Sequence, residues 1–302
     1  MLLKGRSESD ELKATRYLNT RMELTNKEKF HYVNLEKGYE GEVRFDLQAE
    51  ILEEERYIIN DLLLEVNNSY FQIDTLILSQ GVIHLLDIKN YQGDCYLEAD
   101  KLYSVTTARE YKNPVDQLKR SATLFRQLLQ NLKQNYLVEA PVIFINPEFT
   151  LFQAPMDQPI ILPTQVNRFL KDLNKTPSKL NDGHKKLAQT LISLHQTKNP
   201  FTQLPKYNYE QLQKGMYCKT CKSFLVSIKN NDFVCRKCGG HENIQLAILR
   251  NVKEFQLLFP DRKITTRSIY EWCKVGLNKR TFCRVLKKNY TSFGSTSDTY
   301  YV

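Results

Sequence analysis

Three long apolar runs follow one another in the first third of the chain, and short polar turns separate them. YIINDLLLEV, YFQIDTLILS and VIHLLDIKNY are rich in aliphatic, β-branched and aromatic residues, whereas Asn67-Asn68-Ser69 and Gln80-Gly81 are typical of turns. This pattern predicts three consecutive strands. Because helical patterns precede and follow them, the sequence indicates an α/β fold.

Helices are expected on both sides of this meander. The segment from about Ser7 to Glu55 is expected to be mainly helical. Asn113-Pro114 begins another helix, because Asn suits the N-cap and Pro the first helical position. APVIFINP predicts a further buried strand, and a polar helical stretch ends near His195. The apolar face of the helix after Asn113 comprises Val115, Leu118, Phe125, Leu128, Leu129 and Leu132.

Two aspartates and a lysine fall on the predicted second and third strands. If Gln80-Gly81 is a two-residue hairpin turn, the numbers of facing residues sum to 161, and Asp74 lies opposite Asp87. Lys89 shares their face, since strand side chains alternate. Facing carboxylates repel each other unless a cation such as Mg²⁺ or Mn²⁺ compensates them. The alternative is a different register, in which these residues are ordinary charges of an edge strand.

The residues around these aspartates resemble a known family. Five blocks carry the resemblance: Gly38-Tyr39-Glu40-Gly41-Glu42, Gln72-Ile73-Asp74, Gly81-Val82-Ile83, Asp87-Ile88-Lys89-Asn90-Tyr91-Gln92-Gly93 and Asn113-Pro114-Val115-Asp116-Gln117. In order and spacing they resemble the NERD (nuclease-related) domain, roughly from Gly38 to Leu132. That family is placed in the PD-(D/E)xK nuclease superfamily. The resemblance therefore implies a restriction-endonuclease-like mixed sheet flanked by helices.

The resemblance also implies a role for each matching residue. Asp74 and Asp87 would bind a catalytic Mg²⁺ or Mn²⁺, and Lys89 would orient or polarise the attacking water. Glu42 would complete the acidic cluster, and Gln117 would position water or phosphate. The family usually has Glu where this chain has Asp87. Without the resemblance, Glu42 and Gln117 would be interpreted as ordinary residues on helix surfaces.

Four of the seven cysteines form two closely spaced pairs. They are Cys218-Lys219-Thr220-Cys221 and Cys235-Arg236-Lys237-Cys238, and a predicted hairpin with its bend at Asn230-Asn231 lies between them. Two such turns can close a tetrahedron of thiolates around Zn²⁺, and four thiolates leave no open position for catalysis. The sequence therefore predicts a structural zinc ribbon. His241 is a nearby competing ligand that this arrangement does not require.

The C-terminal residues predict a helix-turn-helix. Ile264, Ile269, Trp272 and Cys273 give one short helix an apolar face, Gly276 interrupts it, and Asn278 can cap a second helix. The final residues, TSFGSTSDTYYV, predict a small hairpin that would serve as a wing. The second helix exposes a basic stripe suited to the DNA major groove. Its candidate nucleic-acid-binding residues are Lys279, Arg280, Arg284, Lys287 and Lys288. The alternative is a helical tail with a solvated basic face.

The charge of the chain is concentrated in the same region. The net charge is +9, and the segment His241–Val302 has 11 Lys and Arg residues against 5 Asp and Glu residues. A locally basic module suits a polyanion such as nucleic acid, although a solubilising surface gives the same pattern. The N-terminal residues MLLKGRSESDELK lack the apolar segment of a signal peptide, and no apolar run is long enough to span a bilayer. We therefore expect a cytoplasmic protein that does not contact a membrane and needs no organic cofactor.

These features divide the sequence into expected segments. They are an N-terminal helical segment (1–35), a NERD nuclease-like domain (36–198), a linker (199–214), a zinc ribbon (215–242) and a helix-turn-helix-like basic module (243–302). The expected function is that of a metal-dependent nuclease acting on nucleic acid, most readily DNA. The alternative is a non-catalytic DNA- or RNA-binding protein that uses a nuclease-derived fold.

Overall fold

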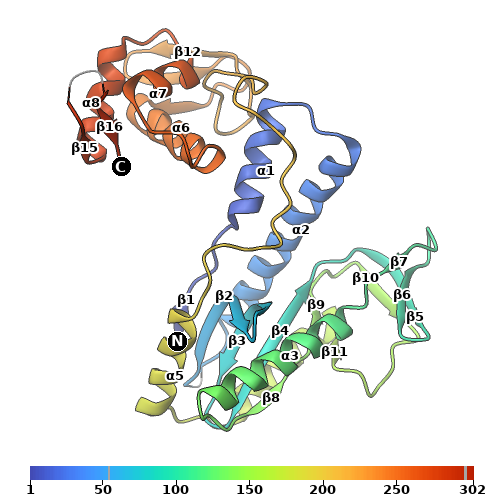
Figure 1. Cartoon of the computed structure of the whole chain (residues 1–302). Helices are drawn as coiled ribbons and strands as arrows, with labels where there is room; N and C mark the ends of the chain where they lie inside the picture. The colour runs from blue at the N-terminus through green and yellow to red at the C-terminus, as the bar shows by residue number, and fades with distance from the viewer. Residues whose placement is uncertain (54, 296–297) are drawn as a thin grey trace. The chain divides into compact units, whose positions relative to one another are not determined.

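Two compact units make up the chain, which Figure 1 shows as a computed structural model. The structure describes residues 1–53, 55–295 and 298–302. The first unit comprises Met1–Glu8 and Val33–Thr202, and the second comprises Ser9–Tyr32 and Gln203–Val302. One helix, α2 (Asn26–Ala49), begins in the second unit and continues into the first.

The first unit is built on a mixed sheet with the strand order β1-β2-β3-β4-β9-β11, and β8 also pairs with β4. The strands are β1 (Leu2–Lys4), β2 (Tyr57–Val66), β3 (Ser69–Leu78), β4 (Val82–Lys89), β8 (Leu137–Glu139), β9 (Val142–Phe144) and β11 (Ile160–Ile161). β2, β3 and β4 form the expected antiparallel meander, whereas β1, β8, β9 and β11 each join a parallel neighbour.

Helices cover both faces of this sheet. They are the second part of α2, α3 (Pro114–Asn131), α4 (Val166–Lys175) and α5 (Asp182–Ser193). α3 and α5 share one buried cluster with Leu76, whereas Phe45 of α2 and Leu170 of α4 share another with Ile77. Because neighbouring strand residues point to opposite faces, the two clusters lie on opposite sides of the sheet. The sequence prediction of a mixed α/β architecture is confirmed.

Local sequence signals explain several element boundaries. Asn67 and Asn68 adopt left-handed backbone angles in the turn between β2 and β3, a conformation that Asn tolerates well. The Asn113 side chain accepts a hydrogen bond from the amide of Val115 at 3.0 Å and caps α3, with Pro114 as its first residue. The expected N-cap and first turn of this helix are therefore present.

A second, four-stranded sheet in the first unit was not expected from the sequence. Its strand order is β10-β5-β6-β7, and its members are β5 (Gly93–Glu98), β6 (Lys101–Ser104), β7 (Glu110–Tyr111) and β10 (Phe149–Phe152). These strands are short, and the turn between β5 and β6 places Ala99 and Asp100 in left-handed backbone conformations. A short 3-10 turn, Pro163–Gln165, precedes α4.

The second unit combines residues from both ends of the chain. Its elements are α1 (Asp10–Arg21), β12 (Val226–Lys229), β13 (Asp232–Cys235), β14 (His241–Asn243), α6 (Ile244–Leu258), α7 (Thr266–Cys273), α8 (Lys279–Asn289), β15 (Ser292–Phe293) and β16 (Tyr300–Tyr301). The guanidinium of Arg21 in α1 donates to the Glu254 carboxylate of α6 at 2.6 Å, and both side chains are fully buried. α1 is therefore part of this core rather than a separate N-terminal segment.

Residues 203–214, which the sequence places in a linker, also pack in the second unit. Leu212 is buried in the same cluster as Leu18 of α1 and Ile248 of α6. The ring of Tyr209 lies 5.7 Å from the ring of Trp272, centroid to centroid. The segment has few aliphatic residues, but its aromatic residues and Leu212 supply the apolar surface that anchors it.

Among the residues that the structure describes, no helix combines the length with the apolar character that a membrane span requires.

Candidate functional site

Asp74, Asp87 and Lys89 lie at the point where β4 leaves β3 and pairs with β9. The β3–β4 register pairs Thr75 with Leu86 and Leu76 with Leu85, so facing numbers sum to 161 as predicted. One step further along this register, Asp74 comes opposite Asp87, and an Asp74 Oδ2 atom accepts a hydrogen bond from the amide of Ile88 at 2.8 Å. The expected juxtaposition of the two aspartates is therefore present.

Lys89 forms a close ion pair with Asp87. Its Nζ atom lies 2.9 Å from Asp87 Oδ1 and 2.8 Å from Asp87 Oδ2. Burial raises the pKa of Asp87 to about 6, with Lys89 opposing the increase and Asp74 adding to it. Burial disfavours the Lys89 ammonium, but the Asp87 and Asp74 carboxylates outweigh it and raise the pKa of Lys89. Lys89 is thus a fixed positive charge at neutral pH, not a proton acceptor.

Glu42 lies on α2, close to the two aspartates. Its neighbour Gly41 allows α2 to pack closely against the end of β4. A Cβ atom added at Gly41 would lie 2.5 Å from Asn90 Cβ and 3.2 Å from a methyl carbon of Ile145. Any larger residue would therefore displace α2 from the end of β4. Burial and the neighbouring Asp74 raise the pKa of Glu42 to about 8, although Arg6 opposes the shift.

An arginine that sequence reasoning missed lies among the acidic side chains. Arg6 follows β1, and its side chain is 3% exposed. It donates to Glu42 Oε2 at 2.8 Å and to Asp61 Oδ1 at 2.7 Å. It also binds both carboxylate oxygens of Asp46, at 2.8 and 3.0 Å, and the Thr75 hydroxyl at 2.8 Å. Arg6 thereby links α2 to β2 and β3.

Asp61 extends the row of aspartates to a third strand. The β2–β3 register pairs Asn60 with Thr75 and Leu62 with Ile73, which brings Asp61 beside Asp74. Asp61 has a left-handed backbone (φ 53°), and its carboxylate accepts hydrogen bonds from Arg6 and from the amide of Ser7. A two-residue turn at Asn67-Asn68 makes facing numbers in β2 and β3 sum to 135, so the sequence could have predicted that Asp61 lies beside Asp74. Arg6 has no such signal, because its partners are at least 36 residues away.

Gln117 is placed differently from the other expected residues. It lies exposed in the first turn of α3. Among the described residues its side chain makes no hydrogen bond to the acidic cluster. Its role in positioning water or phosphate stays a prediction.

A divalent cation fits the two facing aspartates. Asp87 Oδ2 is buried and lacks a donor of good hydrogen-bond geometry, despite the nearby Lys89 ammonium. One carboxylate oxygen of Asp74, Oδ2, accepts a hydrogen bond from the Ile88 amide, and no described residue donates to the other oxygen. When ionised, five neighbouring carboxylates face three cations and leave an excess of two negative charges. The carboxylates are Glu42, Asp46, Asp61, Asp74 and Asp87, and the cations are Lys4, Arg6 and Lys89.

The cation would be held by few protein ligands. In the described part of the chain, the only group of three or more His, Cys, Asp or Glu ligand atoms within 4.8 Å of one another consists of four cysteines. Glu42, Asp74 and Asp87 therefore do not converge that closely. Two carboxylates with several retained waters are typical of Mg²⁺.

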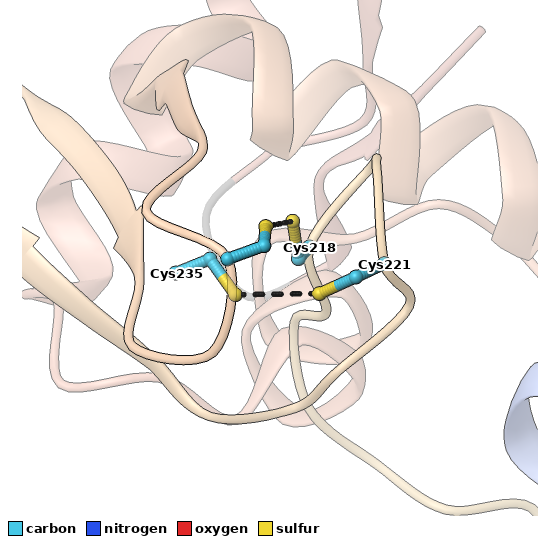
Figure 2. A group of neighbouring side chains, drawn as sticks. Cys218, Cys221 and Cys235 are labelled. Carbon is cyan, nitrogen blue, oxygen red and sulfur yellow. Dashed lines mark hydrogen bonds between the residues drawn. The ribbon is translucent and has the colours of Figure 1, made fainter.

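The four cysteines converge in the second unit (Figure 2). The Sγ atoms of Cys218 and Cys238 are 3.6 Å apart, and those of Cys221 and Cys235 are 3.5 Å apart. Zn–S bonds of about 2.3 Å in a tetrahedron place sulfurs roughly 3.8 Å apart, close to these distances. The cluster is compatible with a zinc ribbon. His241 lies outside it, with its ring 3.6 Å from the Asp232 carboxylate.

The cysteines lie in the loop before β12, at the end of β13 and in the turn between β13 and β14. β12 and β13 pair around the expected bend, where Asn230 has a left-handed backbone. Burial disfavours the Cys218 thiolate, but the backbone amides of Cys221 and Thr220, together with neighbouring thiols, lower the pKa of Cys218 to about 6. A low pKa favours the thiolate form that metal binding requires. The pKa of Cys238 moves the other way: the Gly240 amide lowers it, but the neighbouring thiols of Cys221 and Cys218 raise it to about 12.

Three helices and a small hairpin form the C-terminal part of the second unit. α7 begins at a Thr265 cap and ends at Lys274, which has a left-handed backbone (φ 36°), before the expected break at Gly276. Asn278 caps α8 as predicted, and Phe282, Val285 and Leu286 of α8 are buried. β15 and β16 pair as the expected hairpin. The exposed basic residues of α8 are Lys279, Arg280, Arg284, Lys287 and Lys288.

Comparison with known proteins bears on the first unit. No curated protein and no solved structure gives a significant match to this chain. Residues 37–145 match the family model NERD, the nuclease-related domain. The matched range contains Glu42, Asp74, Asp87, Lys89 and Gln117. This segment of the chain is therefore similar to the nuclease-related domain.

Proposed function

We propose that the first unit is a metal-dependent nuclease that hydrolyses phosphodiester bonds of nucleic acid, with DNA as its substrate. The observation that supports this most strongly is the position of Asp74, Asp87 and Lys89 within the nuclease-related domain. Two carboxylates face each other there across adjacent strands, and a permanently charged lysine lies against one of them. Repulsion would disfavour such a pair in an ordinary sheet.

Each residue has a defined task in this proposal. Asp74 and Asp87 bind Mg²⁺ or Mn²⁺, which when bound polarises a phosphoryl oxygen as a Lewis acid. Lys89 keeps its proton and directs its positive charge at the water or the phosphate, where negative charge develops in the transition state. Glu42 completes the acidic cluster on the α2 side, and Gln117 positions water or phosphate from α3.

The second unit delivers the nuclease to DNA. Zn²⁺ bound by the four cysteines holds the ribbon together, and α8 enters the major groove as a recognition helix with the β15–β16 hairpin as a wing. The exposed side chains of α8 support this assignment, since Arg280, Arg284 and Lys287 form one basic stripe while the opposite face is buried. These residues contact phosphates and base edges.

The test is a cleavage assay on linear, circular and single-stranded DNA and on RNA. We expect cleavage with Mg²⁺ or Mn²⁺, no cleavage in EDTA, and recovery when either ion is restored. Comparison of linear with circular substrates separates exonuclease from endonuclease activity. If the protein binds these polymers but cleaves none with any divalent ion, the proposal fails. A phosphate-binding scaffold derived from a nuclease would then be the better account.

A further inference from the structure

Arg6 lies outside the matched nuclease-related residues, yet it is the most heavily bonded side chain of the acidic cluster. An arginine has five N–H donors. Nε and Nη2 bind the two oxygens of Asp46, Nη1 binds Glu42 and Asp61, and Nη2 also binds Thr75. These five hydrogen bonds use the full donor capacity of the guanidinium. The side chain is therefore held in one position.

The charge of Arg6 is as fixed as its position. The guanidinium does not lose its proton in proteins, and Glu42, Asp61 and Asp46 further raise the pKa of Arg6 against the effect of burial. A permanent cation thus neutralises the Glu42 side of the cluster. Asp74 and Asp87 lie outside its hydrogen bonds. The negative charge of the Asp74 and Asp87 carboxylates is balanced only by Lys89 and by a cation taken up from solvent.

We propose that Arg6 is a built-in cation that occupies the Glu42 side of the acidic cluster, so that the site accepts one divalent ion and not two. This inference rests on the proposed function, because it concerns the ion at Asp74 and Asp87. Two-ion nuclease sites hold their metals roughly 3.5–4 Å apart with carboxylates between them. The guanidinium binds one carboxylate oxygen of Glu42 and one of Asp61, and the Ser7 amide binds the other Asp61 oxygen. Few oxygens therefore remain on this side for a second ion. Arg6 is in this sense a positioning residue, since it fixes Glu42 without contacting the reacting atoms.

The experiment counts bound Mn²⁺ by electron paramagnetic resonance on the full chain, with the cysteine site loaded with zinc. We expect one Mn²⁺ per chain and no magnetic coupling between ions. Asp74→Asn should reduce the count to zero. Glu42→Gln should leave it at one, because Glu42 is engaged by Arg6 and is not a ligand.

Two substitutions of Arg6 complete the test. Arg6→Met removes the charge and should admit a second Mn²⁺ between Glu42 and Asp61, whereas Arg6→Lys should keep the count at one. Circular dichroism identifies variants that do not fold. If Arg6→Met is one of them, the Mn²⁺ count of Glu42→Gln still tests the inference, because loss of the ion there would show that Glu42 is a ligand. The inference is overturned by two coupled ions in the wild-type chain, by loss of the ion in Glu42→Gln, or by a folded Arg6→Met chain with one ion. Cleavage is not measured here, so a chain that binds one ion but cuts nothing contradicts the proposed function and not this inference.

Discussion

The two candidate metal centres differ in how their ligands are brought together. The cysteines come from the loop before β12, the end of β13 and the turn after it, all within 21 residues, and their sulfurs lie within 4.8 Å of one another. The acidic cluster draws on α2, three strands and the segment after β1, and it depends on strand register, on Gly41 and on Arg6. A locally encoded site should respond mainly to loss of its ligands. A site assembled over long range should also respond to packing and to pH.

The largest effect should follow loss of the cysteine ligands. Cys218→Ser/Cys235→Ser should lower the zinc content from one ion per chain to none. It should also unfold much of the second unit, because structural zinc contributes roughly 10–16 kcal/mol of apparent binding free energy. Metal analysis and NMR spectra measure both effects. His241→Ala is the matched control and should retain zinc; an unchanged zinc content in the double variant would contradict a four-cysteine site.

The next effect concerns the approach of α2 to β4. Gly41→Ala should destabilise the first unit by about 1–3 kcal/mol, since the added methyl group has no room beside Asn90. Gly38→Ala in the same helix has nothing within 4 Å of its Cβ and should instead stabilise the chain, by up to about 1 kcal/mol. Urea unfolding of both variants measures the difference. Equal stability of the two would show that Gly41 does not set the position of the helix.

A pH effect should distinguish the acidic cluster from the cysteines. The pKa of Glu42 is raised to about 8, so the folded protein binds a proton there that the unfolded chain releases above its ordinary pKa near 4.5. Without divalent ions, stability should therefore fall as pH rises from about 4.5 to 8, by more than about 1 kcal/mol. Glu42→Gln should lose the part of this slope between about pH 6 and 8 in urea unfolding, because Asp87, whose pKa is raised to about 6, contributes below that range. If the free energy of unfolding changes with pH by the same slope in both proteins, Glu42 is not the group responsible.

The smallest effect concerns the basic face of α8. Changing Arg280, Arg284 and Lys287 to Gln should weaken DNA binding. It should also reduce the slope of log affinity against log salt by about 2–3, since each lost phosphate contact contributes roughly 0.9. Lys253→Gln, an exposed lysine of α6, is the control and should leave the slope unchanged. Fluorescence anisotropy at several salt concentrations gives the slopes. Equal slopes for the triple variant and the wild type would argue against a recognition helix.

Sequence patterns predicted those parts of the molecule that depend on neighbouring residues. The hairpin turn at Gln80-Gly81 was enough to give the register that brings Asp74 beside Asp87. The Asn113 cap and the cysteine hairpin also follow from local chemistry. In each case a few adjacent residues determine the geometry.

Long-range contacts explain what the sequence did not predict. Arg21 and Glu254 are separated by 233 residues, and only the folded core shows that α1 belongs with the C-terminal helices. Arg6 reaches Thr75 across 69 residues, so no spacing rule links it to the acidic cluster. The sheet formed by β5, β6, β7 and β10 needs β10 to pair in parallel with β5, a strand more than 50 residues earlier, and strands of two to six residues do not predict such a contact.

The length of the side chain at position 87 can be tested directly, because the resemblance to the nuclease-related domain implies Glu where this chain has Asp87. If the shorter side chain suits this site, Asp87→Glu should displace the ion and lower the cleavage rate. If the shorter side chain instead weakens metal binding, the same change should raise the rate. Initial rates at saturating Mn²⁺ distinguish the two. An unchanged rate would mean that the length of this side chain does not limit metal binding.

Single-turnover cleavage by Asp74→Asn tests the central claim most directly. The change preserves the size of the side chain and removes a ligand charge. We therefore expect the rate to fall by about 10²–10³-fold or more with either Mg²⁺ or Mn²⁺. Asp172→Asn, an exposed aspartate of α4 paired with Lys175, should cleave at the wild-type rate. A folded Asp74→Asn protein that cleaves DNA as fast as the wild type would contradict a nuclease centre at Asp74 and Asp87.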